Sequence, residues 1–215
     1  MTDKPEGVGA APTNPKSKIQ NPKSELPPLA ELGEPADWRR VYGRLAPLVV
    51  EIGCGGGRTI IGMAAAHPDW DCLAIEQAGE YYNILHERAE KRALPNLRVA
   101  RIDAAYLVNR FFADSCVAQY HIYFPDPWPK KRHHKRRLFK EEFCRDLRRT
   151  LAPDGILYFA TDHQDYFVEL LPLLRATLKV TEHPEPWPDA PEGRTNYEVK
   201  YLREGRPIYR LIATR

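Results

Sequence analysis

Short apolar runs alternate along the chain with longer stretches in which apolar residues recur every three or four positions. The short runs are rich in β-branched residues and predict strands at 48–52, 71–76, 97–102, 117–124, 156–161, 178–182 and 207–215. The longer stretches predict helices at 60–67, 79–93, 139–151 and 165–177. Strands that alternate with helices, followed by two closing strands, indicate one α/β domain with a doubly wound sheet of seven strands.

The first 30 residues differ from the rest of the chain. They contain six prolines and several lysines but no aromatic residue. Such a segment has too little apolar surface to order itself, so we predict a disordered tail over 1–30 and a single domain over 31–215. The lysines of the tail either contact a polyanion or are simply solvated, and the second interpretation is favoured.

A glycine-rich turn directly follows the first predicted strand. Its pattern is E-x-G-x-G-x-G, formed by Glu51, Gly53, Gly55 and Gly57. It matches neither the G-x-G-x-x-G of dinucleotide sites nor the G-x-x-x-x-G-K-[ST] of phosphate loops. A carboxylate beside a turn that a ligand can approach closely suits a cationic ligand, and the spacing resembles motif I of Rossmann-like methyltransferases that bind S-adenosylmethionine. A purely structural turn is the alternative.

Acidic residues close the second and third predicted strands. Glu76 ends the second strand, where a carboxylate in Rossmann-like folds bonds the ribose hydroxyls of a nucleoside. Asp103 ends the third strand, and ligands of open α/β sheets lie at the carboxyl ends of the strands. The alternatives are an ordinary strand-end glutamate for Glu76 and a helix N-cap for Asp103.

The most unusual segment of the chain follows the fourth predicted strand. Three prolines stiffen a loop around Asp126 and Trp128, and six of the eight residues at 130–137 are Lys or Arg. A run this basic beside a ligand cleft favours a nucleic-acid surface over a solvated loop. The adjacent His133 and His134 belong to this basic face, because no cysteine or acid nearby completes a metal site. Trp128 either stacks on a base or anchors the loop.

Composition adds little beyond these motifs. The net charge of +3 is small, and no apolar run is long enough to span a membrane. The four cysteines are widely separated, which predicts reduced thiols and a cytoplasmic location.

From residue 48 onward the chain resembles the bacterial tRNA (guanine-N7-)-methyltransferases. The most specific marker is FPDPWPKKRHHKRR at 124–137, and EIGCGGG, LAIE, RIDA, TDHQDYF and TNYE occur in the order of that family. The resemblance implies a Rossmann-like enzyme that transfers the methyl group of S-adenosylmethionine to N7 of guanine 46 in the tRNA variable loop. It implies tRNA as the partner, no membrane and no metal, and it leaves the oligomeric state open.

The resemblance also implies roles for individual residues. The cofactor-binding residues are Glu51, Gly53, Gly55, Gly57, Glu76, Asp103 and Asp126, and Asp126 is also the catalytic residue. The residues implied to contact tRNA are Lys130, Arg132, His133, His134, Lys135, Arg136, Arg137, Asp162, Thr195, Asn196, Tyr197 and Glu198. Asn196 departs from the pattern, because the family often has Lys or Glu at that position.

Two other functions compete with this one. A Rossmann-like methyltransferase that acts on ribosomal RNA, protein or a small molecule would share the glycine turn. The basic loop disfavours a small molecule, and the PDPWP sequence disfavours the other two. A non-catalytic RNA-binding module would have lost the acids expected to bind the cofactor, yet the chain retains them.

Overall fold

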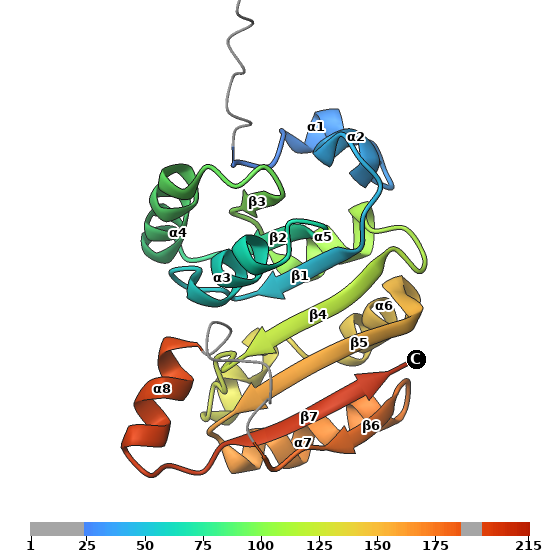
Figure 1. Cartoon of the computed structure of the whole chain (residues 1–215). Coiled ribbons are helices and arrows are strands. Elements are labelled where there is room, and N and C mark those ends of the chain that lie inside the picture. The colour runs from blue at the N-terminus through green and yellow to red at the C-terminus, as the bar shows by residue number, and fades with distance from the viewer. Residues whose placement is uncertain (1–23, 186–194) are drawn as a thin grey trace, which may run out of the picture.

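A seven-stranded sheet forms the centre of the molecule in the computed structural model, which describes residues 24–185 and 195–215 (Figure 1). The strand order is β3-β2-β1-β4-β5-β7-β6. The strands are β1 (Leu48–Ile52), β2 (Asp71–Ile75), β3 (Leu97–Ala100), β4 (Val117–Tyr123), β5 (Leu151–Thr161), β6 (Lys179–Glu182) and β7 (Tyr209–Thr214). The pairs among β1 to β5 are parallel, whereas β7 runs antiparallel to both β5 and β6. This arrangement confirms the predicted doubly wound α/β fold.

Helices cover both faces of the sheet. Figure 1 shows α3 and α4 on the near face and α5, α6 and α7 on the far face. The helices are α1 (Leu29–Leu32), α2 (Trp38–Tyr42), α3 (Arg58–Ala66), α4 (Gly79–Arg92), α5 (Ala104–Phe111), α6 (Glu141–Thr150), α7 (Gln164–Arg175) and α8 (Asn196–Arg203), with a 3₁₀ helix η1 (Lys131–Arg136). Within the described part of the chain, no helix is long and apolar enough to cross a bilayer.

The two helical layers enclose two separate cores. The larger core includes Tyr120 and Phe159 and lies against α5, α6 and α7. The smaller core includes Val49, Ile60 and Leu85 and lies between the sheet and α3 with α4. All five residues of β1 are buried, because this strand is central and is covered on both faces.

The order in which strands are added to the sheet reverses beside β1. From β1 it proceeds outward to β2 and β3, and it then returns to place β4 on the other side of β1. The helices that leave these neighbouring strands therefore diverge to opposite faces, which opens a crevice at the carboxyl ends of the strands. The glycine turn, Glu76, Asp103 and the Pro-rich loop all lie at this rim.

The structure changes the predicted boundary between tail and domain. Residues 1–23 lie outside the described residues, but residues 24–30 pack on the domain. Leu26 is buried and donates its backbone N–H to the carbonyl of Val99, and Ser24 hydrogen-bonds the carboxylate of Glu90. Pairing of the backbone with the edge strand β3 orders this segment, which composition alone cannot reveal.

Several further elements differ from the sequence prediction, among them β5, α5 and α8. Strand β5 begins at Leu151 rather than at 156, with an irregularity in its pairing to β4 where Pro153-Asp154-Gly155 interrupts the register. Helices α5 and α8 were not predicted; the one buried residue of α8 is the charged Glu198, and its apolar residues stay half-buried or exposed.

Candidate active site

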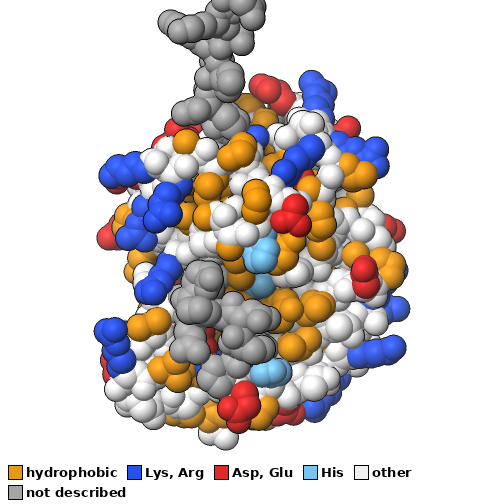
Figure 2. Space-filling model, in the orientation of Figure 1, with side chains coloured by type: hydrophobic (Ala, Val, Ile, Leu, Met, Phe, Trp, Pro, Cys, Tyr) orange, Lys and Arg blue, Asp and Glu red, His pale blue; other side chains and the backbone are white. Residues whose placement is uncertain are grey.

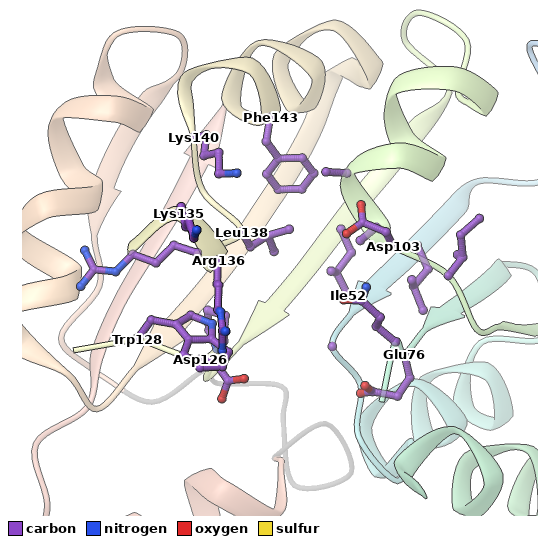
Figure 3. A pocket seen from close by; sticks show the side chains of 18 of the residues that line it. Ile52, Glu76, Asp103, Asp126, Trp128, Lys135, Arg136, Leu138, Lys140 and Phe143 are labelled. Carbon is purple, nitrogen blue, oxygen red and sulfur yellow. The ribbon is translucent and has the colours of Figure 1, made fainter. Parts of the chain in front are cut away.

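Two hollows adjoin at the carboxyl ends of the central strands. The larger has a volume of about 740 Å³ and the smaller a volume of about 340 Å³. The residues that line both are Gly53, Glu76, Pro125 and Asp126. In Figure 3, Glu76 and Asp103 lie on one side of the larger hollow, and Asp126 and Trp128 lie on the opposite side. The structure therefore brings together acids from three separate loops.

The glycine turn needs its glycines for two different reasons. Gly55 has φ +53°, in the left-handed region, and a Cβ atom there would meet nothing within 4 Å. Gly57 has φ +74°, and a Cβ atom there would collide with Leu85 of α4. Gly57 also lines neither hollow, so its role is the close packing of α3 on α4. Gly53 and Gly55 line the smaller hollow, and the cofactor contacts predicted for the three glycines stay predictions.

Glu76 is held by the backbone on both of its oxygens. Oε2 accepts the N–H of Gly55 and Oε1 accepts the N–H of Ala78, each at 2.8 Å. These bonds fix the carboxylate at the junction of the two hollows with further lone pairs available. The arrangement suits a pair of ligand hydroxyls, and the ribose contact stays a prediction.

Glu51 is buried at the floor of the smaller hollow. Its Oε2 accepts the N–H of Ile60 at 2.9 Å, in the first turn of α3. Burial removes the carboxylate from water, and the charge of nearby Glu76 adds repulsion, so that the pKa of Glu51 is raised to about 8. A cation bound beside it would favour the ionised form, as expected for a carboxylate that receives a cationic ligand.

Asp103 caps helix α5. Its Oδ1 accepts the N–H of Tyr106 at 2.8 Å, so the N-cap alternative is confirmed. The side chain is exposed and lines the larger hollow, and its Oδ2 is not used by the cap. One oxygen can therefore cap the helix while the other contacts a ligand, so the predicted cofactor contact remains compatible with the cap.

The Pro-rich loop presents Asp126 to solvent. Phe124 and Trp128, which flank it, have φ of +49° and +43°, and the N–H of Phe124 donates to the carbonyl of Ala160. The structure gives Asp126 no hydrogen bond or ion pair to the residues that it describes. The left-handed backbone at Phe124 and Trp128 therefore turns the loop so that the unpaired carboxylate of Asp126 lies where the two hollows meet.

Trp128 packs on the basic segment that follows it. The guanidinium of Arg136 lies 4.9 Å from the centroid of the Trp128 ring, and His133 meets the ring edge-on. The structure thus supports the interpretation that Trp128 anchors the loop. The ring also lines the larger hollow, so stacking on a base stays a prediction.

The basic segment itself is the helix η1, with Lys130 as its N-cap residue. Lys130, Arg132, Lys135 and Arg136 are exposed, and His133 and His134 are half-buried. Arg137 is different. It is buried, donates to the carbonyl of Pro127 at 2.7 Å, and pairs with Glu169 of α7. Arg137 therefore holds the loop in place and also lines the larger hollow, and its contact with RNA stays a prediction.

The side chains of the predicted segment 195–198, at the start of helix α8, point in different directions. Thr195 caps the helix, and Asn196 and Tyr197 face the smaller hollow. Glu198 points away from the hollow into a buried ion pair with Arg210 of β7, at 2.6 Å. This pair fastens α8 to the sheet, and the contact of Glu198 with substrate stays a prediction.

Asp162 lies apart from both hollows. Its carboxylate pairs with Arg206 at 2.6 Å, beyond the end of α8, and it lines neither hollow. The contact of Asp162 with substrate stays a prediction.

The sequence interpretation missed several side chains that line the smaller hollow. Tyr81 and Tyr123 both line it, and the hydroxyl of Tyr123 shares a hydrogen bond of 2.8 Å with Nδ1 of His121. Arg58 directly follows the glycine turn and lines the same hollow. Tyr81 follows Glu76 by five residues and Tyr123 ends β4. These positions at the carboxyl ends of strands were the signal from which the sequence could have placed both tyrosines in the site. Among the described residues, no group of three acids, histidines or cysteines is arranged to hold a metal ion.

Comparisons with known proteins agree with this geometry. A family model described as a putative methyltransferase matches residues 45–211. The tRNA (guanine-N(7)-)-methyltransferase of Alkalilimnicola ehrlichii is 39% identical over 190 residues, which cover 87% of this chain and 79% of the relative. That of Geobacter metallireducens is 38% identical over 184 residues, covering 83% of this chain and 87% of the relative.

Solved structures support the fold alone. A 30S ribosomal A1408 methyltransferase from an uncultured bacterium superposes with a TM-score of 0.60 at 15% identity, covering 83% of this chain and 92% of the other. The 16S rRNA methyltransferase KamB superposes with a TM-score of 0.58 at 14% identity, covering 82% of this chain and 90% of the other.

Proposed function

Because this chain belongs to the tRNA (guanine-N(7)-)-methyltransferase family, we propose that it methylates N7 of guanine 46 in the tRNA variable loop with S-adenosylmethionine as the methyl donor. The observation that carries the proposal is the position of Asp126. This exposed carboxylate stands where two hollows meet, with the glycine turn on one side and the basic segment η1 on the other.

The residues of the two hollows fit the proposed cofactor. Ile75 and Ile102 offer apolar contact for a purine ring in the larger hollow, with the free oxygen of Asp103 at its edge. Glu76 offers lone pairs to two ribose hydroxyls. Glu51 lines the smaller hollow, where a cationic amino or sulfonium group would stabilise its ionised form.

When bound, the cofactor supplies a methyl group on a sulfonium, which departs as a neutral thioether. N7 of guanine carries a free lone pair, so no side chain has to remove a proton before attack. The main task of the protein is to align N7 with the methyl group at near-attack distance. Asp126 can accept hydrogen bonds from N1–H and N2–H of the guanine, which sets its orientation.

Asp126 also supplies charge. Methylation of N7 makes the purine cationic, and a carboxylate already in place stabilises that charge more strongly in the transition state than in the ground state. The exposed cations of η1 would hold the phosphates that flank the target. N7 is inaccessible in the deep groove of regular A-form RNA, so an irregular loop nucleotide is the expected target.

One assay tests the proposed function. The protein is incubated with S-adenosylmethionine carrying a labelled methyl group and, in separate reactions, with bulk tRNA and with ribosomal RNA. We expect label in tRNA only, and borohydride–aniline treatment should cleave the product after the variable-loop guanine. Label in ribosomal RNA, or cleavage at another tRNA position, would contradict the proposal. The tRNA partner also favours the cytoplasmic location expected from the cysteines.

A further inference from the structure

A third hollow adjoins the active site beside helix α8. Its volume is about 400 Å³, and it is lined by Arg58, Asn196, Val199, Lys200, Arg203 and Glu204. Arg58 and Asn196 also line the smaller active-site hollow, whereas no residue is shared with the larger one. The three hollows therefore form a series along the carboxyl rim. The basic segment η1 borders one end of the series, and α8 borders the other.

The cations of this hollow come from elements far apart in the sequence. Asn196, Lys200 and Arg203 are spaced by four and three residues, so they share one face of α8. Arg58 begins α3 and donates from Nη1 to Oδ1 of Asn196 at 3.1 Å, which ties the two elements together. In Figure 2, Lys and Arg side chains gather along the edge of the molecule that carries α4 and α8.

The positive charge of this surface is poorly balanced by its own acids. Among the described residues, Glu204 is the one carboxylate that lines the hollow, and it is shared between Lys200 at 3.9 Å and Arg206 at 3.8 Å. Lys200 keeps 61% of its side chain exposed. Three cations around one shared carboxylate repel one another and produce a positive potential, which a bound anion would relieve.

We propose that Arg58, Lys200 and Arg203, here called the α8 patch, bind backbone phosphates of the RNA substrate. The proposal deepens the proposed function, because it assumes that the target guanine enters beside Asp126. An RNA strand whose base reaches that point crosses the rim, with η1 on one side and the α8 patch on the other. Guanidinium groups suit such contacts, since they bind phosphate oxygens in pairs. The α8 patch would thus hold the strand on the far side of the target.

The test compares two double variants that lose the same charge. Lys200→Gln/Arg203→Gln removes two cations of the α8 patch. Arg92→Gln/Lys179→Gln removes two exposed cations at the opposite rim, where α4 ends and β6 begins. Binding of fluorescently labelled tRNA is measured by anisotropy from 50 to 300 mM KCl. Each lost phosphate contact should lower the slope of log affinity against log salt by roughly 0.7–0.9.

We expect the α8 variant to bind tRNA more weakly at low salt and with a flatter slope, while the control keeps the wild-type slope. The KM for tRNA should rise with kcat unchanged, because the patch does not touch the reacting atoms. A wild-type slope in the α8 variant, or an equal change in the control, would overturn the inference. Wild-type protein that binds tRNA but does not methylate it would instead refute the proposed function, and the binding comparison would still decide the role of the patch.

Discussion

Among single residues, Asp126 has the most direct consequence for catalysis. Asp126→Asn keeps the shape of the side chain but removes its charge and presents an N–H group to one guanine donor. If the carboxylate acts mainly in the transition state, kcat and kcat/KM fall together, by about a hundredfold to a thousandfold. Single-turnover kinetics with saturating enzyme isolate this step. A variant that methylates at the wild-type rate would leave Asp126 with no catalytic role.

Glu76 should control cofactor affinity rather than RNA affinity. Glu76→Gln loses the charge proposed to receive the ribose hydroxyls and places an amide against one of two backbone N–H groups. A hydrogen bond to a charged group contributes about 1.5–3 kcal/mol, so S-adenosylmethionine should bind about ten to a hundred times more weakly. Calorimetry measures this change, and tRNA affinity serves as the control. Equal cofactor affinity in the two proteins would refute the ribose contact.

Glu51 should make stability depend on pH. Its pKa is raised from 4.5 to about 8, so between these values the folded protein holds a proton that the unfolded chain has released. The stability that this proton confers is full below pH 4.5 and is lost as pH rises toward 8, by at most about 1.4 kcal/mol per pH unit.

Glu51→Gln removes that dependence, because the amide is neutral at every pH. Denaturant unfolding of both proteins at pH 6, 7 and 8 should show wild type losing stability relative to the variant. Other titrating groups, such as His121, whose pKa burial lowers to about 3, cancel in this difference. Parallel stability curves for the two proteins would show that Glu51 is already ionised in the folded state.

Residue type and position in the chain identified the acids at the rim of the site but not the direction of every side chain. Glu76, Asp103 and Asp126 follow strands and reach the rim, as the pattern predicts. Glu198 and Arg137 have the right residue types but turn inward, because each has a partner far away in sequence. Such pairs depend on packing between α8 and β7, or between the loop and α7, which local sequence does not encode.

At the scale of elements, the basic segment contains two kinds of arginine. Arg136 is exposed and lies over Trp128, whereas adjacent Arg137 is buried among Pro127, Tyr166 and Glu169. Arg137→Gln should therefore lower the free energy of unfolding by about 1–3 kcal/mol, through lost hydrogen bonds and ring contact. Arg136→Gln should leave stability nearly unchanged but weaken tRNA binding and flatten its salt dependence.

These two neighbouring variants are matched controls for each other. Chemical denaturation gives the stabilities and anisotropy in a salt series gives the affinities. The assignment fails if Arg136→Gln destabilises the protein as much as Arg137→Gln does, or if Arg137→Gln flattens the salt slope while stability is retained.

Helix α8 shows why some elements were not predicted. Its apolar residues stay half-buried or exposed, and its one buried residue is the charged Glu198, so it does not pack on the core as α6 and α7 do. Tertiary contacts form it instead, namely the cap by Thr195, the ion pair of Glu198 and the bond from Arg58 to Asn196. The strands of the sheet were easier to predict, because burial on both faces requires continuous apolar runs.

For the whole molecule, the reversal of strand order beside β1 places every proposed contact on one rim. The carboxyl ends of the parallel strands carry the acids proposed to bind the cofactor, the Pro-rich loop and the hollows that link η1 to α8. The alternation of strands and helices predicted a doubly wound sheet of seven strands, whereas the full strand order and the relation between the three hollows required the structure. The account therefore predicts one RNA-binding surface that surrounds a single methyl-transfer site.

Replacing the attacking atom in the substrate tests this account most directly. Two tRNA transcripts are compared, one with guanine at position 46 and one with 7-deazaguanine there, in which a C–H group replaces N7. We expect both transcripts to bind the protein equally well and only the guanine transcript to accept the methyl group. Equal transfer of labelled methyl to the 7-deazaguanine transcript would contradict it, because the methyl group would then be joining another atom.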